Sequence, residues 1–210
     1  MGATELLASS LGRKDDEPNK ELAREIIRMN RTDWVAELAS HVDDQDKNIQ
    51  SDCLKVLYEI AEHGNPELIA PYWEIFIDLL VSKNNRLVWG AMTALDMMTL
   101  LKPKEIYSKL RIVEEGIRKG SVITIDHGVG VLAQLASFRE FRKELMPKLI
   151  HELARCPIKQ LPQYLERSQV AFCKQTKEDF LGIIEIRSPE LERDSQVNRV
   201  VRIRKILEKI

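Results

Sequence analysis

Three stretches of the chain share one pattern of small and large side chains, and this repetition restricts the possible folds more than any other feature. They are IQSDCLKVLYEIAEHG from Ile49, LVWGAMTALDMMTLLK from Leu87 and TIDHGVGVLAQLASFR from Thr124. A small residue recurs at one position, and large apolar residues follow at helical spacing. The small residues are Cys53, Ala91 and Gly128, and the large ones are Leu57, Ile60, Leu95, Met98, Leu132 and Leu135. These positions share one helical face, and the small residues let a neighbouring helix approach closely.

Each repeated stretch follows another stretch that reads as a helix, so the chain is predicted to be a series of antiparallel helix pairs. The preceding helices are expected over residues 32–42, 66–81 and 103–119, and residues 141–155 open a fourth pair. Between the first and second pairs, Gly64 suits a helix stop, Asn65 an N-cap and Pro66 the first helical position. The three repeated stretches are separated by a nearly constant number of residues, which is typical of repeat proteins.

Over residues 32–156 this pattern resembles the HEAT repeat family. Pro71 and Pro147 lie near the start of first helices, as in many HEAT repeats, whereas the third unit has Ser108 near that place. At the position where the family favours Arg, each of the three units has a different residue, namely Gln50, Val88 and Ile125. An armadillo or other helical-pair solenoid therefore remains an alternative. The resemblance implies an all-α protein, an α-α superhelix (HEAT/ARM-like solenoid) of about five antiparallel helix pairs.

Three local features complete the expected domain organisation. SVITIDHGVGV is rich in β-branched residues, which favours a strand, but the repeat register places Gly128 at the close-approach position, so we predict a helix. TELLASS and NKELAREIIRMN are expected to form capping helices within residues 1–31. Residues 157–210 are expected to add a helical pair and a capping helix in the same domain, with the last helix starting at Ser188 and Pro189.

Composition excludes several classes of function. The net charge is −1, so no global field attracts nucleic acid or an anionic membrane. The three cysteines are far apart and lack ligand-spaced histidines, which argues against a zinc site or a disulfide framework. The first residues lack a basic segment followed by an apolar run. We therefore expect a cytoplasmic protein without a membrane segment, a metal or a cofactor.

Candidate catalytic groups are sparse, and we expect no enzyme activity. A HEAT-like deoxyhypusine hydroxylase uses several His-Glu pairs, whereas here only His151-Glu152 occurs. A HEAT-like DNA glycosylase would use an aromatic residue and an Asp in a basic groove; Trp89 and Asp96 lie two turns apart, but the surrounding charge is acidic. For His127, a structural hydrogen bond is favoured over an acid/base role. An enzyme or lyase subunit that holds a small molecule or a modified residue remains the alternative.

A basic run in the last helix is the other candidate site. Its residues are Arg199, Arg202, Arg204 and Lys205. Such a run can bind nucleic acid or an acidic protein. Cations near a helix C-terminus more often belong to a solvent-exposed helix face, so nucleic-acid binding is not favoured.

The second helices carry apolar residues on the side opposite the core stripe, which in HEAT proteins lines the concave surface. An apolar centre containing Trp and Met within a polar rim is typical of a protein-binding hot spot. The predicted binding face consists of Tyr58, Trp89, Thr93, Asp96, Met97, Leu100, Gly130 and Ala133. We therefore expect a scaffold or adaptor that binds a basic and apolar segment of another protein, unless neighbouring helices bury this face.

Overall fold

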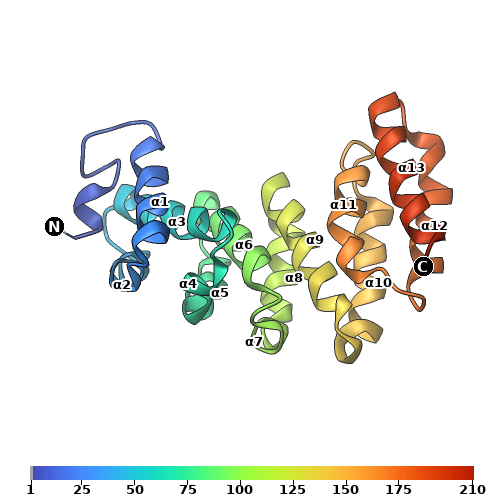
Figure 1. The fold of residues 1–210 in the computed structure, drawn as a ribbon, viewed down its shortest axis with the longest axis horizontal. Helices are drawn as coiled ribbons and strands as arrows, with labels where there is room; N and C mark the ends of the chain where they lie inside the picture. Colours follow the sequence, from blue (N-terminus) through green and yellow to red (C-terminus); the bar gives the residue numbers. More distant parts are fainter. Residues whose placement is uncertain (1) are drawn as a thin grey trace. The chain divides into compact units, whose positions relative to one another are not determined.

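The computed structural model describes residues 2–210, and every regular element in that range is a helix (Figure 1). The prediction of an all-α protein is confirmed. The chain divides into two compact units, one ending at Gly128 and the other running from Val129 to Ile210. This division falls inside α9 (Val122–Ser137), whereas the sequence placed boundaries after residues 31 and 156.

The repeated helix pairs lie at the predicted places: the first two belong to the first unit, and the third ends in α9, which continues into the second unit. The pairs are α2 with α3, α4 and α5 with α6, and α7 and α8 with α9, and α3 packs against α1, α2 and α6. The bounds are η1 (Thr4–Leu6), α1 (Glu17–Met29), α2 (Thr32–Ser40), α3 (Lys47–Glu62), α4 (Pro66–Ile69), η2 (Ala70–Tyr72), α5 (Trp73–Leu79), α6 (Asn85–Met98), α7 (Pro103–Ser108) and α8 (Leu110–Lys119).

Side-chain caps and one glycine set the ends of the second helices. Asp46 accepts the N–H of Asn48 at the start of α3, and Asn84 accepts the N–H of Arg86 at the start of α6. Gly64 follows α3 with a φ of +87°, a left-handed conformation that glycine adopts without steric cost. These contacts explain why the second helices begin and end close to the predicted residues.

Two first helices that were predicted as continuous are broken. Residues 66–81 form α4, η2 and α5, because Pro71 lacks the N–H that would continue the α-helical hydrogen bonding. Residues 103–119 divide at Lys109, and the hydroxyl of Ser108 donates to the carbonyl of Glu105 at 2.6 Å. Such a bond competes with the helical ladder.

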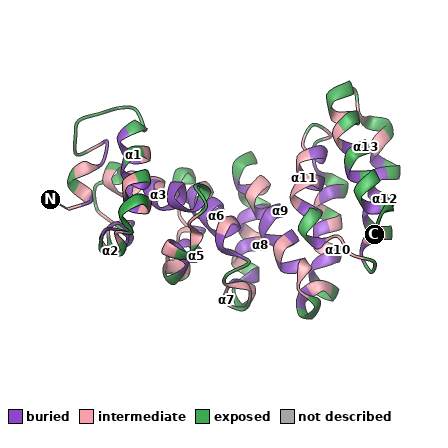
Figure 2. Cartoon of the chain, viewed as in Figure 1, coloured by how far each residue is buried: buried purple, intermediate pink, exposed green. Residues whose placement is uncertain are grey.

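α9 is a helix throughout, so the register-based prediction for SVITIDHGVGV is confirmed. A Cβ on Gly128 would lie 2.3 Å from Cγ1 of Ile117 on α8. This is closer than any carbon contact allows, so the small residue at this repeat position is required by close helix packing. Cys53 and Ala91, at the equivalent positions, are fully buried in the core. Figure 2 shows buried stretches along α3 and α6.

The N-terminal segment caps the first unit through hydrogen bonds rather than through the predicted helix. TELLASS forms only the short η1 followed by turns. Buried Asn19 accepts the N–H of Ala8 at 2.9 Å and donates to Asp52 at 2.8 Å, while Asp52 also accepts the N–H of Ser9. Polar side chains of α1 and α3 therefore satisfy main-chain groups that a longer helix would have paired internally.

The second unit adds two further pairs to the three above, in agreement with about five. Its elements are α10 (Arg139–Arg155), α11 (Leu161–Arg167), η3 (Ser168–Ala171), α12 (Lys177–Arg187), η4 (Ser188–Glu190) and α13 (Asp194–Glu208). The predicted start of the last helix at Ser188 is wrong. Arg187 is almost fully buried; it pairs with Glu190 and donates to the carbonyls of Leu153 and Cys156, which fixes a turn at this place.

Candidate functional site

Tyr58 and Trp89 form an aromatic pair between α3 and α6. Their ring centroids are 5.5 Å apart at an interplanar angle of 58°, a geometry that aromatic rings favour. The ammonium of Lys55 lies 4.7 Å from the centroid of the Tyr58 ring. Gly90 allows this close approach, since a Cβ there would lie 2.9 Å from Leu54. Tyr58 is buried and Trp89 is half-buried, so the indole is the accessible partner.

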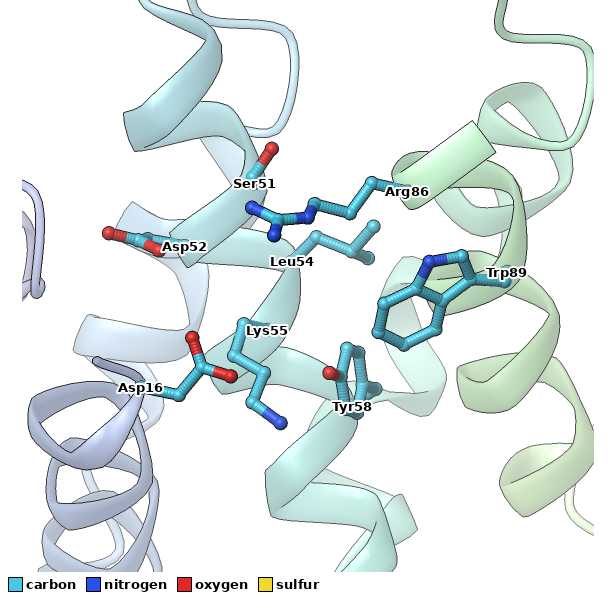
Figure 3. Close-up of a pocket in the computed structure, with 8 residues that line it drawn as sticks. All are labelled: Asp16, Ser51, Asp52, Leu54, Lys55, Tyr58, Arg86 and Trp89. Atoms are coloured by element: carbon cyan, nitrogen blue, oxygen red, sulfur yellow. The ribbon is translucent and has the colours of Figure 1, made fainter. Parts of the chain in front are cut away.

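A small cavity of about 60 Å³ opens beside this pair (Figure 3). We call it the α3–α6 groove, and its lining residues are Asp16, Ser51, Asp52, Leu54, Lys55, Tyr58, Arg86 and Trp89. A larger hollow of about 400 Å³ shares Asp16, Ser51, Asp52 and Arg86 with it and continues over the loop at Arg13–Asp15. The groove therefore does not end at Arg86.

Two of the four charged residues that line the groove, Lys55 and Asp52, have partners within the protein. Lys55 is paired with the buried carboxylate of Glu59, and this bond raises the pKa of Lys55 despite the opposing effect of burial. Burial raises the pKa of Tyr58. Both carboxylate oxygens of Asp52 accept hydrogen bonds from the N-terminal cap. These groups hold the walls of the groove in place.

Arg86 and Asp16 differ from their neighbours. Within residues 2–210, neither side chain makes a hydrogen bond or an ion pair, and both are exposed. Arg86 extends from the start of α6 across the groove toward α3, and Asp16 precedes α1 on the facing wall (Figure 3). The groove thus offers one free cation and one free anion.

The structure corrects the predicted binding face at several residues. Thr93 and Asp96 are each 2% exposed, and Ala133 is fully buried, as is most of Gly130 in the second unit. Because α3 packs against α6, much of the predicted face of α6 is covered. Met97 is half-buried and Leu100 is 50% exposed, and they lie at the C-terminal end of α6.

The buried polar residues of α6 have structural partners. The Thr93 hydroxyl donates to the carbonyl of Trp89 at 2.9 Å. Asp96 lies 2.8 Å from Nδ1 of His127, so this histidine makes a side-chain hydrogen bond, as expected. His41 and His63 contact the carbonyls four residues earlier at 2.8 Å and complete the ends of α2 and α3.

The acidic rim is weaker than the sequence suggested. Glu59 is buried against Lys55, and Asp96 is buried against His127. Glu62 is exposed at the end of α3, where partial desolvation and the charge of Glu59 raise its pKa. Of the acidic residues on this face, Glu59 is neutralised by Lys55, and Asp96 is buried and in contact with His127.

The basic C-terminal run is also partly neutralised. Arg199 forms two bonds with Glu166, at 2.7 and 2.6 Å, and Arg204 pairs with Glu208 at 3.1 Å. In the described chain, Arg202 and Lys205 are exposed and lack an ion pair. Two separate cations on α13 present a weak field to a polyanion.

Two further kinds of site are absent from residues 2–210. No group of three or more His, Cys, Asp or Glu side chains is placed to hold a metal ion. No helix among these residues is long and apolar enough to cross a membrane. Glu152, next to the exposed His151, is paired with Arg155 at 2.8 Å.

The sequence interpretation missed Arg86, Asp16, Asp52 and Leu54. Arg86 precedes Trp89 by three residues, and residues at that spacing share a helix face, so a signal for Arg86 was present. Asp16 carried no such signal, because it belongs to the loop before α1 and reaches the groove only through the tertiary fold.

No protein-family model matches the chain, and no curated protein matches it by sequence. Among solved structures, one engineered protein aligns over 100% of both chains with a TM-score of 0.63 and 16% identity. A second engineered protein has a TM-score of 0.61 and 16% identity over 100% of this chain and 98% of its own. A designed armadillo repeat protein has a TM-score of 0.60 and 10% identity over 98% of this chain and 99% of its own. These likenesses show that the chain has the fold of an armadillo- or HEAT-like helical-repeat solenoid.

Proposed function

We propose that this chain is a non-enzymatic protein-binding module and that the α3–α6 groove receives an extended segment of its partner. The observation that carries the proposal is the half-buried Trp89, which is held against Tyr58 beside a groove with unpaired polar groups. A rigid aromatic residue with an apolar face and a free N–H is the type of residue that dominates binding energy at protein interfaces.

The fold supports the general class of function in this assignment, protein binding. Stacked helical repeats present successive second helices to one surface, and such surfaces commonly bind other proteins. The surface proposed here is smaller than the one expected from sequence. It keeps Trp89 and part of Tyr58 but omits Thr93 and Asp96, which serve packing.

Two other classes of function have less support. The cavity beside Trp89, of about 60 Å³, is smaller than ligand pockets, which usually measure about 300–1,000 Å³, whereas the adjoining hollow of about 400 Å³ reaches that size. An enzyme would also need its catalytic groups beside the bound molecule. Asp96 and His127 bind each other and line neither the groove nor the adjoining hollow. Nucleic-acid binding would rest on Arg202 and Lys205 alone, because the other cations of the run are paired.

The test is a selection of random short peptides displayed on phage, with wild-type protein as bait. Peptides that bind through the groove should lose at least about tenfold in affinity for Trp89→Ser, the effect of removing one hot-spot aromatic. Val81→Ser is the control, because Val81 is 71% exposed and lines a different cavity.

Circular dichroism and melting temperature verify that both variants fold. Loss of binding in the Trp89 variant with retention in the Val81 variant supports the proposal. Binders that are insensitive to Trp89, or a selection that yields no binder to wild type, would overturn it.

A further inference from the structure

The polar groups that remain unused in the α3–α6 groove are mainly hydrogen-bond donors on one side. The guanidinium of Arg86, the hydroxyl of Ser51 and the indole N–H of Trp89 surround Leu54 (Figure 3). Within the described residues, none of these side-chain groups donates a hydrogen bond to another part of the protein. Three hydrogen-bond donors around one apolar side chain form a binding site for a hydrogen-bond acceptor.

Arg86 supplies a positive charge that no carboxylate of the described residues pairs with, although Asp16 and Asp52 also line the groove. Both oxygens of Asp52 are occupied by Ser9 and Asn19, and no ion pair joins Asp52 or Asp16 to Arg86. Lys55 is paired with Glu59 and adds no free charge. The guanidinium is therefore the unneutralised cation among the residues that line this groove.

We propose that the α3–α6 groove selects a partner segment in which an acidic side chain lies next to an apolar one, and that Arg86 recognises the carboxylate. This inference rests on the proposed function. A guanidinium presents parallel N–H groups that fit the two oxygens of a carboxylate, and the pairing is both charged and directional. The apolar neighbour packs on the exposed face of Trp89.

The shape of the groove favours an acidic side chain within a chain over a free C-terminus. The depression continues past Arg86 into the hollow of about 400 Å³, so a bound segment can extend in both directions. Asp16, on the facing wall, is placed to accept a main-chain N–H of that segment. Cation and anion together fix the position of the backbone as well as that of the side chain.

This assignment differs from the basic segment that the sequence suggested. That expectation depended on acidic residues which the fold pairs internally, namely Glu59 with Lys55 and Asp96 with His127. Glu62 remains exposed but does not line the groove.

The test uses three synthetic peptides, acetyl-Gly-Leu-X-Leu-Gly-amide, in which X is Glu, Gln or Lys. Binding is followed by the shift of the Trp89 indole N–H resonance during titration. The Glu peptide should bind at least about tenfold more tightly than the Gln and Lys peptides at low salt, and this preference should shrink as salt is raised. The same peptide with X as Gln and a free C-terminal carboxylate separates the terminal group from the side chain.

Arg86→Gln should remove the preference for Glu, because Gln keeps the length of a polar side chain but loses the charge. Arg111→Gln is the matched control, since Arg111 is an exposed residue of α8 that lies outside the groove. Equal binding of the three peptides, a preference for Lys or for the free C-terminus, no shift with any peptide, or a Glu preference that survives in Arg86→Gln would each overturn the inference. Display-selected peptides that bind through Trp89 without an acidic residue would leave the proposed function intact.

Discussion

Replacing Gly128 by Ala tests the close packing of α9 against α8, on which the repeat register depends. In an open helix interior this change stabilises a protein by about 1 kcal/mol, because Ala has the higher helix propensity. Here the new Cβ would lie 2.3 Å from Cγ1 and 2.9 Å from Cδ1 of Ile117, which is buried. An ordinary carbon contact is about 3.5–4.0 Å. Ile117 or the helix axis must therefore move by more than about 1 Å.

Forced overpacking of this kind costs about 1–3 kcal/mol. We expect Gly128→Ala to lower the free energy of unfolding by that amount and, at about 2–4 °C per kcal/mol for a chain of this size, to lower Tm by several degrees. The assay is thermal and urea unfolding followed by far-UV circular dichroism. Ile117→Ala in the Gly128→Ala background should recover part of the loss, as a coupling energy of about 0.5–3 kcal/mol in a double-mutant cycle.

Gly182→Ala is the matched control. Gly182 lies inside α12, and a Cβ there would meet no atom within 4 Å, so this variant should melt at the wild-type temperature or above it. If Gly128→Ala is as stable as Gly182→Ala, the two helices do not approach as described, and the explanation of the small-residue position fails.

Three further outcomes follow from the polar contacts. Asn19→Ala should cost about 1–3 kcal/mol in urea unfolding, because it leaves the buried main-chain N–H of Ala8 without an acceptor and removes one of the two donors to Asp52; a change below the error of the measurement would contradict the capping role. Burial alone would raise the pKa of Glu37, but three hydrogen bonds from the N-terminal segment lower it below the ordinary 4.5. A lowered folded-state pKa gives stability that is complete at neutral pH and is lost as pH falls through that pKa, so wild type should lose more stability than Glu37→Gln between pH 5 and acid unfolding; parallel curves would refute this. Burial raises the pKa of the Cys53 thiol to about 12, whereas hydrogen bonding involving Thr176 outweighs burial and lowers that of Cys173. In native protein Cys173 should react first with a thiol reagent, and mass spectrometry of the labelled peptides identifies the order.

The helices could be predicted from sequence where a periodic pattern and a local stop signal agree. α3 and α6 have an apolar stripe, a capping Asp or Asn, and a clear end, so their bounds came out close to those observed. The breaks in the first helices at Pro71 and Lys109 were not predicted, because each depends on a single residue within an otherwise helical pattern. The turn after α12 was missed because it is fixed by Arg187, whose carbonyl partners lie more than thirty residues earlier in the chain.

The candidate site was predictable only in part. Trp89 was identified because it lies opposite the core stripe, and it is accessible in the structure. Thr93 and Asp96 share that face, but their burial depends on how closely neighbouring helices pack. The pairing of Asp96 with His127 joins residues more than thirty positions apart, and no local pattern encodes it. The free charge of Arg86 likewise depends on which neighbours are already paired.

The decisive measurement is the NMR spectrum of the three tryptophan indole N–H groups, recorded while a display-selected peptide is added. Trp34 is buried and Trp73 begins α5, and neither lines the α3–α6 groove, so both serve as internal references. Binding in the groove predicts that the Trp89 resonance, assigned by its absence in Trp89→Phe, shifts in a saturable way while the other two stay in place. A bound peptide that leaves Trp89 unchanged, or that shifts Trp73 instead, would show that the α3–α6 groove is not the binding surface.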